Sequence, residues 1–129
     1  MNGLILFAHG ARDPRWAAPF EAVAARLRAL RPGGALRLAY LELMQPTLAE
    51  AAAELAAAGC TRLTVLPMFL GTGGHLRQDL PRLADALRAA LPGVEIVLHG
   101  AIGEVDAVIA AMADAAASLV DDGHNPPAR

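Results

Sequence analysis

The chain has 129 residues, of which 55% are apolar, and a formal net charge of −2. One domain of this length buries enough apolar surface for a stable core, and the slightly negative charge argues against general nucleic-acid binding. Apart from histidine, every basic residue is an arginine, which excludes a Walker-A lysine, a Schiff-base lysine and a pyridoxal-phosphate anchor.

Cysteine content and hydropathy indicate the cellular compartment. Cys60 is the only cysteine, so no internal disulfide forms and a reducing compartment is favoured. Residues 1–7 lack a basic segment and resemble a first strand more than a secretion signal. No apolar stretch approaches the roughly 20 residues of a membrane span. We therefore expect a cytoplasmic protein with no membrane partner.

The first half of the chain predicts a strand, a helix and a second strand. The uninterrupted apolar run Leu4–Phe7 is typical of a strand covered on both faces. Helical periodicity follows from Arg15 to Leu30 and ends at the Pro-Gly-Gly segment 32–34. The next strand is Leu36–Leu41, and Arg37 within it indicates a sheet edge.

The second half repeats this alternation. A helix follows Pro46, with a Thr47–Glu50 capping box at its start and Gly59 at its end. The remaining strands are Leu63–Leu66 and Ile96–Leu98. The remaining helices are marked by apolar positions in 80–91 and 105–119, with Pro81 placed in the first turn of the earlier one.

Four strands that alternate with four helices predict an α/β fold with one parallel sheet, right-handed crossovers and helices on both faces. Arg37 and Glu95 place the second and fourth strands at the edges, which gives a flavodoxin-like order of 2-1-3-4. We expect a single domain over residues 1–120 and a disordered tail over 121–129, where prolines and polar residues gather.

Reactive residues follow the strands at one edge of this sheet. His9, Glu42, His75 and His99 each come after a strand, and parallel α/β sheets bind ligands beyond the carboxyl ends of their strands. His9 and His75 flank glycines in loops of the two central strands, which makes them the strongest candidates. His124 lies in the tail, and we expect no role for it.

Each candidate also has an ordinary structural interpretation. His99 fits a hydrogen-bonded strand-end residue, and Glu42 fits a helix cap or a solvated charge. The arginines fit solvated surface charge, although Arg12 and Arg77 stand beside the two histidines and suit anion binding. Apolar residues near the same edge fit either packing or the wall of a flat ligand's site. These apolar residues are Met44, Met68, Phe69 and Leu70.

Several chemistries are excluded. Ser118, the only serine, lies late in the last helix, so there is no nucleophile elbow. Cys60 falls at the opposite sheet edge from the histidines, which removes a cysteine nucleophile. The glycine-rich segment 71–74 lacks both the G-K-[ST] ending and the G-x-G-x-x-G spacing of known phosphate-binding loops. What remains is imidazole and carboxylate, which bind borderline divalent ions and accept protons near neutral pH.

The loops at this edge carry a family resemblance. The segments L-F-A-H-G-A-R-D-P at 6–14, L-E-L-M-Q-P at 41–46 and L-P-M-F-L at 66–70, with Gly74-His75 and Asp79-Leu80-Pro81, resemble the short form of the sirohydrochlorin chelatases. These are the class II cobalto- and ferrochelatases. The similarity extends to about residue 115. Ala11 stands where serine is commoner in the family.

The resemblance implies insertion of a divalent ion into sirohydrochlorin, a metal-free tetrapyrrole, in cobalamin or siroheme biosynthesis. Cobalt is the expected ion, iron and nickel are alternatives, and no tightly bound cofactor is expected. His9 and His75 correspond to the residues that handle the metal and accept protons, and Glu42 to an assisting glutamate. The expected substrate-binding residues are Arg12, Arg15, Met44, Phe69, Leu70, Gly73, Gly74 and Arg77.

The short form resembles one lobe of the larger two-lobed chelatases, so a homodimer with a shared active-site cleft is expected. Two other functions stay open. One is a non-catalytic metal or tetrapyrrole carrier, which would use the same ligands. The other is phosphoryl transfer through His9, although histidine phosphatases have an arginine where Ala8 stands here.

Overall fold

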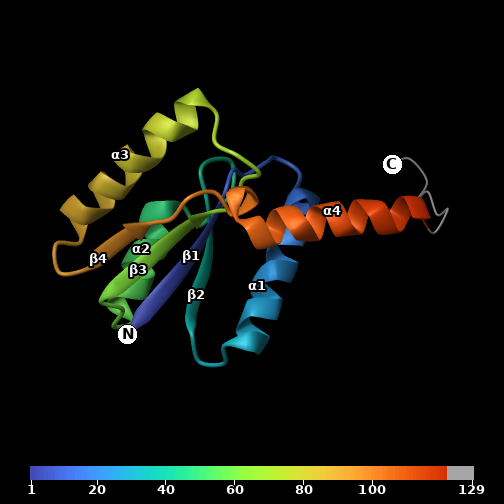
Figure 1. Ribbon diagram of the computed structural model, residues 1–129. Coiled ribbons are helices and arrows are strands. Elements are labelled where there is room, and N and C mark those ends of the chain that lie inside the picture. The colour runs from blue at the N-terminus through green and yellow to red at the C-terminus, as the bar shows by residue number, and fades with distance from the viewer. Residues whose placement is uncertain (122–129) are drawn as a thin grey trace.

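The computed structural model describes residues 1–121 and contains one four-stranded parallel sheet (Figure 1). The strands are β1 (Asn2–Ala8), β2 (Ala35–Tyr40), β3 (Arg62–Pro67) and β4 (Glu95–Leu98), in the order β2-β1-β3-β4. The predicted order 2-1-3-4 is confirmed, and Arg37 and Glu95 do lie on the two edge strands. Apolar β1 is central because it is buried on both faces.

The helices follow the strands as the periodicity predicts. They are η1 (Pro14–Ala17), α1 (Ala18–Leu30), α2 (Leu48–Ala57), α3 (Gly74–Ala90), η2 (Ile102–Glu104) and α4 (Asp106–Asp121). The capping box before α2 is confirmed, since Thr47 and Glu50 exchange both hydrogen bonds. Gly59 follows α2 with a φ of 106°, the left-handed conformation that glycine adopts at low cost.

Three predicted boundaries were wrong. Helix α3 begins at Gly74, well before Leu80, so Pro81 lies inside the helix and not in its first turn. The predicted helix from Arg15 is split, because Pro14 and Pro19 favour a short 3₁₀ turn before α1. Asp121, assigned to the tail, closes α4. The rest of the predicted tail lies outside the described residues.

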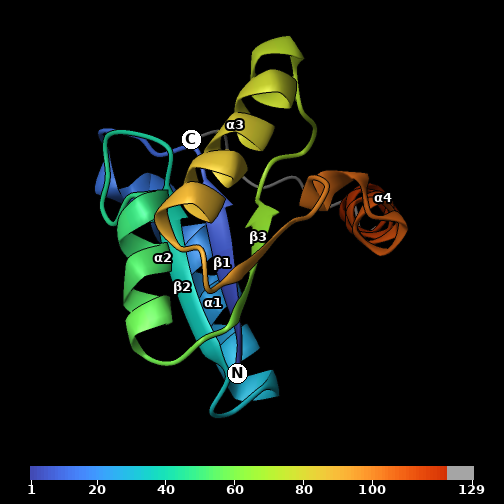
Figure 2. The ribbon, with the colours of Figure 1, turned by 90° about the vertical axis from the view of Figure 1, so that its left-hand side faces the viewer.

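The core lies mainly between the sheet and the layer formed by α2 and α3. Ile5 and Phe7 of β1 pack there with Leu63 and Val65 of β3, all with 1% exposure or less. On the opposite face, Ala8, Ala17 and Tyr40 form a smaller buried cluster under α1. Figure 2 shows α2 and α3 on one side of the sheet and α1 on the other. Helices on both faces are therefore confirmed.

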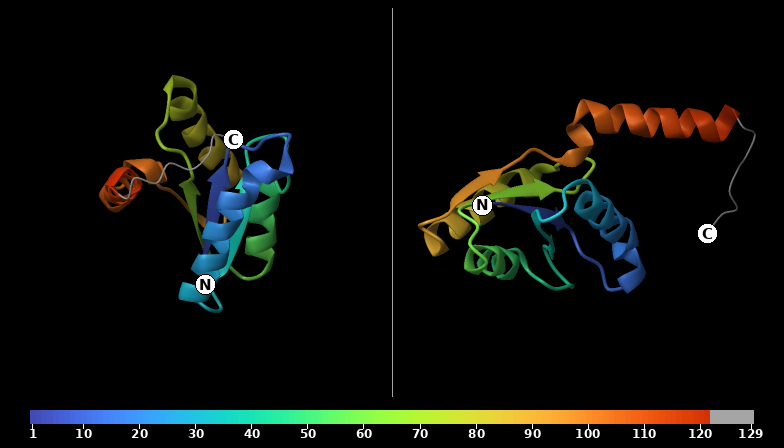
Figure 3. Two further views of the ribbon diagram at one scale, coloured as in Figure 1. Left: turned by 90° about the vertical axis from the view of Figure 1, so that its right-hand side faces the viewer. Right: turned by 90° about the horizontal axis from the view of Figure 1, so that it is seen from below.

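The last helix departs from this layered arrangement. Helix α4 projects away from the sheet, as the right-hand view of Figure 3 shows, and none of its residues is buried. Its connection to the rest of the chain is η2, at the carboxyl end of the sheet. Across residues 1–121, no helix has the length and hydropathy needed to cross a bilayer.

Candidate metal-transfer site

The loops after β1 and β2 are joined backbone to backbone. The Leu41 N–H donates to the Ala8 carbonyl at 2.9 Å, and the Glu42 N–H donates to the His9 carbonyl at 3.1 Å. Gly10 has a φ of 97°, and a Cβ at this position would collide with the Glu42 carbonyl oxygen. A glycine after the histidine is therefore what allows the two loops to approach.

This backbone contact brings the His9 and Glu42 side chains together. Nε2 of His9 lies 3.2 Å from Oε1 of Glu42, and the side chains are 48% and 56% exposed. A carboxylate only accepts hydrogen bonds, so Nε2–H of His9 donates, and in the neutral imidazole Nδ1 then keeps a lone pair. The His9 ring also packs edge-on against Phe69, with ring centroids 6.3 Å apart. The pair is thus held in orientation yet open to a ligand.

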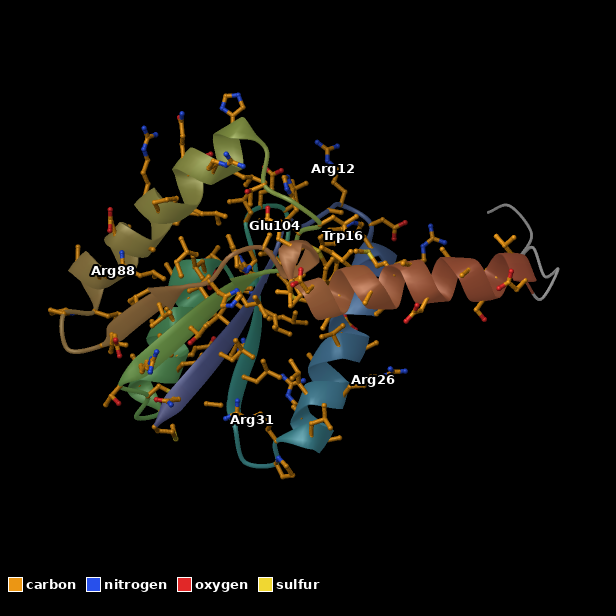
Figure 4. All side chains as sticks on the ribbon, viewed as in Figure 1. Arg12, Trp16, Arg26, Arg31, Arg88 and Glu104 are labelled. Carbon is orange, nitrogen blue, oxygen red and sulfur yellow. The ribbon has the colours of Figure 1, made fainter. Side chains whose placement is uncertain are left out.

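The candidate arginines differ in what already binds them. Arg15 donates from Nε and Nη2 to the Asp13 carboxylate, with the shortest distance 2.8 Å. Side-chain and backbone hydrogen bonds from Arg15 lower the pKa of Asp13, and the Asp13 carboxylate raises the pKa of Arg15. Arg12, which points away from the body of the molecule in Figure 4, and Arg77 have no ion-pair partner among residues 1–121. They remain available to an anion.

His75 is not part of the His9–Glu42 pair in a single chain. It lies in the first turn of α3, is exposed, and makes no hydrogen bond to His9 or Glu42 in the described part of the chain. No group of three or more histidine, cysteine or acidic side chains within residues 1–121 is arranged to hold a metal ion. One chain therefore presents a two-residue pair at this edge, with a second histidine standing apart.

The remaining candidates form the surroundings of the pair. Phe69 is partly buried against the main core, Met44 packs on the smaller cluster, and Leu70 is 73% exposed. Gly73 and Gly74 are exposed, and a Cβ at either would meet nothing within 4 Å. Within residues 1–121 nothing requires glycine there, so these positions are free for close approach of a ligand.

His99 has the ordinary role that its strand-end position favours. Its Nδ1 lies 2.8 Å from the Gly100 carbonyl oxygen, which accepts the hydrogen bond. The sequence interpretation missed two other residues, Gly10 and Gly103, whose missing side chains permit contacts with Glu42 and Leu70. The sequence does show a glycine directly after a strand-end histidine. It does not show that this glycine contacts the Glu42 backbone.

The family model that matches this chain is CbiX, over residues 3–119. The chain belongs to the CbiX family. Sirohydrochlorin cobaltochelatase of Saccharolobus solfataricus is 35% identical over 83 residues, which is 64% of this chain and 63% of that protein. The protein of the same name from Methanopyrus kandleri is 29% identical over 83 residues, 64% of this chain and 58% of that one. The matched segment thus spans less than two thirds of these relatives.

Solved structures show the same fold. A CbiX protein from Marinobacter aquaeolei VT8 has a TM-score of 0.83 and 33% identity, with 95% of this chain and 99% of that chain covered. The sirohydrochlorin chelatase SirB from Bacillus subtilis subspecies spizizenii, in complex with cobalt, has a TM-score of 0.78 and 21% identity. It covers 92% of this chain and 50% of that one, so this CbiX chain corresponds in fold to half of SirB.

Proposed function

We propose that this CbiX protein inserts a divalent metal ion, cobalt first among them, into sirohydrochlorin. The observation that carries the proposal is the His9–Glu42 pair at the carboxyl edge of a CbiX-family sheet. The name sirohydrochlorin cobaltochelatase on relatives at 29–35% identity supports the substrate and the reaction class.

The chemistry requires a base and a metal ligand at one place. Insertion replaces two pyrrole N–H protons with one M²⁺ ion, so two protons leave as the ion sheds its water. With Nε2–H bound to Glu42, Nδ1 of His9 is the atom that accepts a proton or holds the ion. Glu42 keeps the ring in this tautomer and stabilises the imidazolium after proton transfer. An open, two-residue pair suits passing the ion on, whereas a storage site closes the coordination shell.

The substrate's carboxylates need cationic partners. Arg12 and Arg77 serve that role best, since neither has an ion-pair partner in residues 1–121, while Arg15 is engaged by Asp13. The exposed Gly73–Gly74 start of α3 has no side-chain cap, so its first backbone N–H groups are free to bind another carboxylate. Phe69, Leu70 and Met44 supply apolar surface for the macrocycle.

A flat macrocycle needs a wall on each side, and one sheet edge supplies only one. We therefore include a two-fold homodimer in the proposal, with the carboxyl edges of the two copies forming one cleft. His9 and His75 of both chains then surround the same ring. The resemblance of this chain to half of SirB supports that arrangement.

The test is an optical assay of sirohydrochlorin with cobalt, iron and nickel in turn. We expect many turnovers with cobalt and some with iron or nickel, because imidazole sites discriminate poorly among these ions. His9→Ala or His75→Ala should remove most of the activity while circular dichroism stays unchanged, since both residues are exposed.

Two results would contradict the proposal. Release of no more than one equivalent of product per chain would favour the carrier alternative. Full activity in a folded His9→Ala variant would contradict the assignment of the His9–Glu42 pair to metal insertion. A strict requirement for an ion other than cobalt would correct the metal and leave the reaction in place.

A further inference from the structure

A hollow of about 260 Å³ lies at the amino ends of the strands, between the end of α1 and the starts of β1, β2 and β3. The His9–Glu42 pair lies at the carboxyl ends of the same strands. Strand β1 has seven residues, so roughly 20 Å of extended chain separates the hollow from His9. The hollow is therefore distinct from the candidate metal-transfer site.

Three arginines line this hollow. Arg28 lies in the last turn of α1, Arg31 directly follows that helix, and Arg62 is the first residue of β3. Arg28 and Arg31 make no ion pair within residues 1–121, whereas Nε of Arg62 lies 3.5 Å from Oε2 of Glu95. None of the described lining residues is acidic. Three guanidinium groups against one neighbouring carboxylate leave an excess of two positive charges.

Neutral donors and apolar side chains complete the lining. Asn2 pairs in register with Arg62, and Thr64 lies two residues further along β3, so the three side chains share one face of the sheet. The amide of Asn2 and the hydroxyl of Thr64 can both donate hydrogen bonds. The apolar part of the lining includes Leu4, Leu27 and Leu36. This combination suits an anionic group attached to a small, partly apolar molecule.

The backbone holds Arg31 at the hollow. Its N–H donates to the Leu27 carbonyl at 2.9 Å, and its carbonyl accepts from the Gly34 N–H at 3.0 Å. Gly33 makes this tight turn possible with a φ of 80°. A fixed turn lowers the ordering cost of binding. Figure 4 shows Arg31 beside β2, whereas Arg26 points outward from α1.

One local feature opposes an anion. The carboxyl end of α1 faces this region, and a helix dipole places about half a negative charge there. The arginine excess of two positive charges outweighs it. The volume also limits the ligand, because 260 Å³ lies below the roughly 300–1,000 Å³ of sites for drug-sized molecules. The hollow therefore fits an ion or a small metabolite.

We propose that this hollow binds a small oxyanion with at least two negative charges, of the class of phosphomonoesters and polycarboxylates. Guanidinium groups bind phosphate and carboxylate oxygens through paired N–H donors. Asn2 and Thr64 donate to the oxygens that the arginines leave free. The inference goes beyond metal insertion and does not depend on it.

An NMR titration of isotope-labelled protein at low ionic strength tests the proposal. Inorganic phosphate is the probe in one series and citrate in the other. We expect the largest backbone amide shifts at Gly3, Gly34 and Ala35, which line the hollow. For at least one of the two anions the Kd should be about 1 mM or lower.

Variants of the arginines provide the second measurement. The double variant Arg28→Gln, Arg31→Gln removes two cations, so its Kd should rise at least about tenfold. Arg26→Gln is the matched control, since Arg26 is exposed on the same helix and does not line the hollow. It should bind as the wild type does. The amide spectra of both variants check that the fold is retained.

The outcomes separate the two sites. Binding of phosphate alone identifies a phosphoryl ligand, binding of citrate alone identifies a polycarboxylate, and either supports the inference. Shifts confined to the loops of Arg12 and Arg77 would overturn it, because the anion would then bind at the carboxyl edge. Absence of saturable shifts with both anions up to about 10 mM, or equal Kd values for the double variant and Arg26→Gln, would also overturn it.

Metal insertion, measured in anion-free buffer, distinguishes this inference from the proposed function. The double variant should insert metal at the wild-type rate, because both arginines lie far from His9. A wild-type protein that binds the anion in the hollow and inserts no metal would contradict the proposed function alone. A protein that inserts metal and binds neither anion there would contradict this inference alone.

Discussion

Gly10 determines where Glu42 stands relative to His9. Its φ of 97° and the Glu42 carbonyl oxygen, which lies where a Cβ would stand, leave no room for a side chain. We predict that Gly10→Ala lowers the free energy of unfolding by at least about 2 kcal/mol and separates the pair, with loss of metal insertion. Gly71→Ala is the control, since nothing lies within 4 Å of its added Cβ. Urea denaturation measures both, and a Gly10→Ala variant as stable as Gly71→Ala would refute the prediction.

In the proposed mechanism, Glu42 acts through its charge as well as its position. Glu42→Gln keeps an oxygen that accepts the His9 hydrogen bond and removes the carboxylate that stabilises the imidazolium. We predict that the variant lowers kcat by roughly 10- to 100-fold and changes tetrapyrrole affinity much less. Steady-state assays from about pH 6 to 9, which spans histidine titration, measure this. Glu21→Gln on α1 is the matched control. Equal kcat for Glu42→Gln and wild type across that range would reduce Glu42 to a structural residue.

At this scale the sequence predicts which residues gather but not how they touch. His9 and Glu42 follow neighbouring strands, and parallel strands end at one edge, so their convergence could be inferred. The Gly10 contact depends on the exact path of two loops, which periodicity does not encode. Whether the predicted roles of His9, His75 and Glu42 are correct stays a prediction.

Among the elements, α2 anchors the loop that carries Glu42. The Thr47–Glu50 capping box closes the start of α2, and the Tyr40 N–H donates to the Pro46 carbonyl at 2.9 Å just before it. We predict that Thr47→Ala costs about 1 kcal/mol of stability and reduces activity by loosening this loop. Thr47→Ser, which keeps the hydroxyl, should retain both. Thermal denaturation checks the stability, and equal melting temperatures for the three proteins would contradict the role of the cap.

Element types were easier to predict than element ends. The box at Thr47 and the stop at Gly59 have local sequence signals, and both were confirmed. The start of α3 has none, because Gly73, Gly74 and Pro81 all disfavour helix locally. The helix nevertheless begins at Gly74, since Leu80, Ala84 and Leu87 bury one face against the core and outweigh those preferences.

For the whole molecule, two charged residues were enough to order the sheet. Arg37 and Glu95 need water, so their strands had to be edges, and the observed order β2-β1-β3-β4 agrees. The position of α4 could not be inferred in this way. The apolar residues of α4 recur at helical spacing, yet none of its residues is buried and the helix projects away from the sheet (Figure 3).

A shared cleft makes a prediction about mixed dimers that no single-chain site makes. A His9→Ala dimer keeps two copies of His75 and no His9, and a His75→Ala dimer keeps the reverse. A heterodimer of one chain of each kind has one intact His9 and one intact His75 in the same cleft. Because an asymmetric substrate in a two-fold site uses only some of the four histidines in each turnover, that heterodimer should regain activity.

The measurement requires heterodimers purified through two different tags, since simple mixing leaves both parents present. We predict a metal-insertion rate at least about tenfold above the average of the two parent dimers, the size of effect that one restored general base supports. A His9→Ala dimer whose two chains carry the two different tags controls for the purification. If each chain instead completes its own site, every chain in the mixed dimer lacks one histidine, and its rate equals the parental average. That equality would contradict the shared cleft.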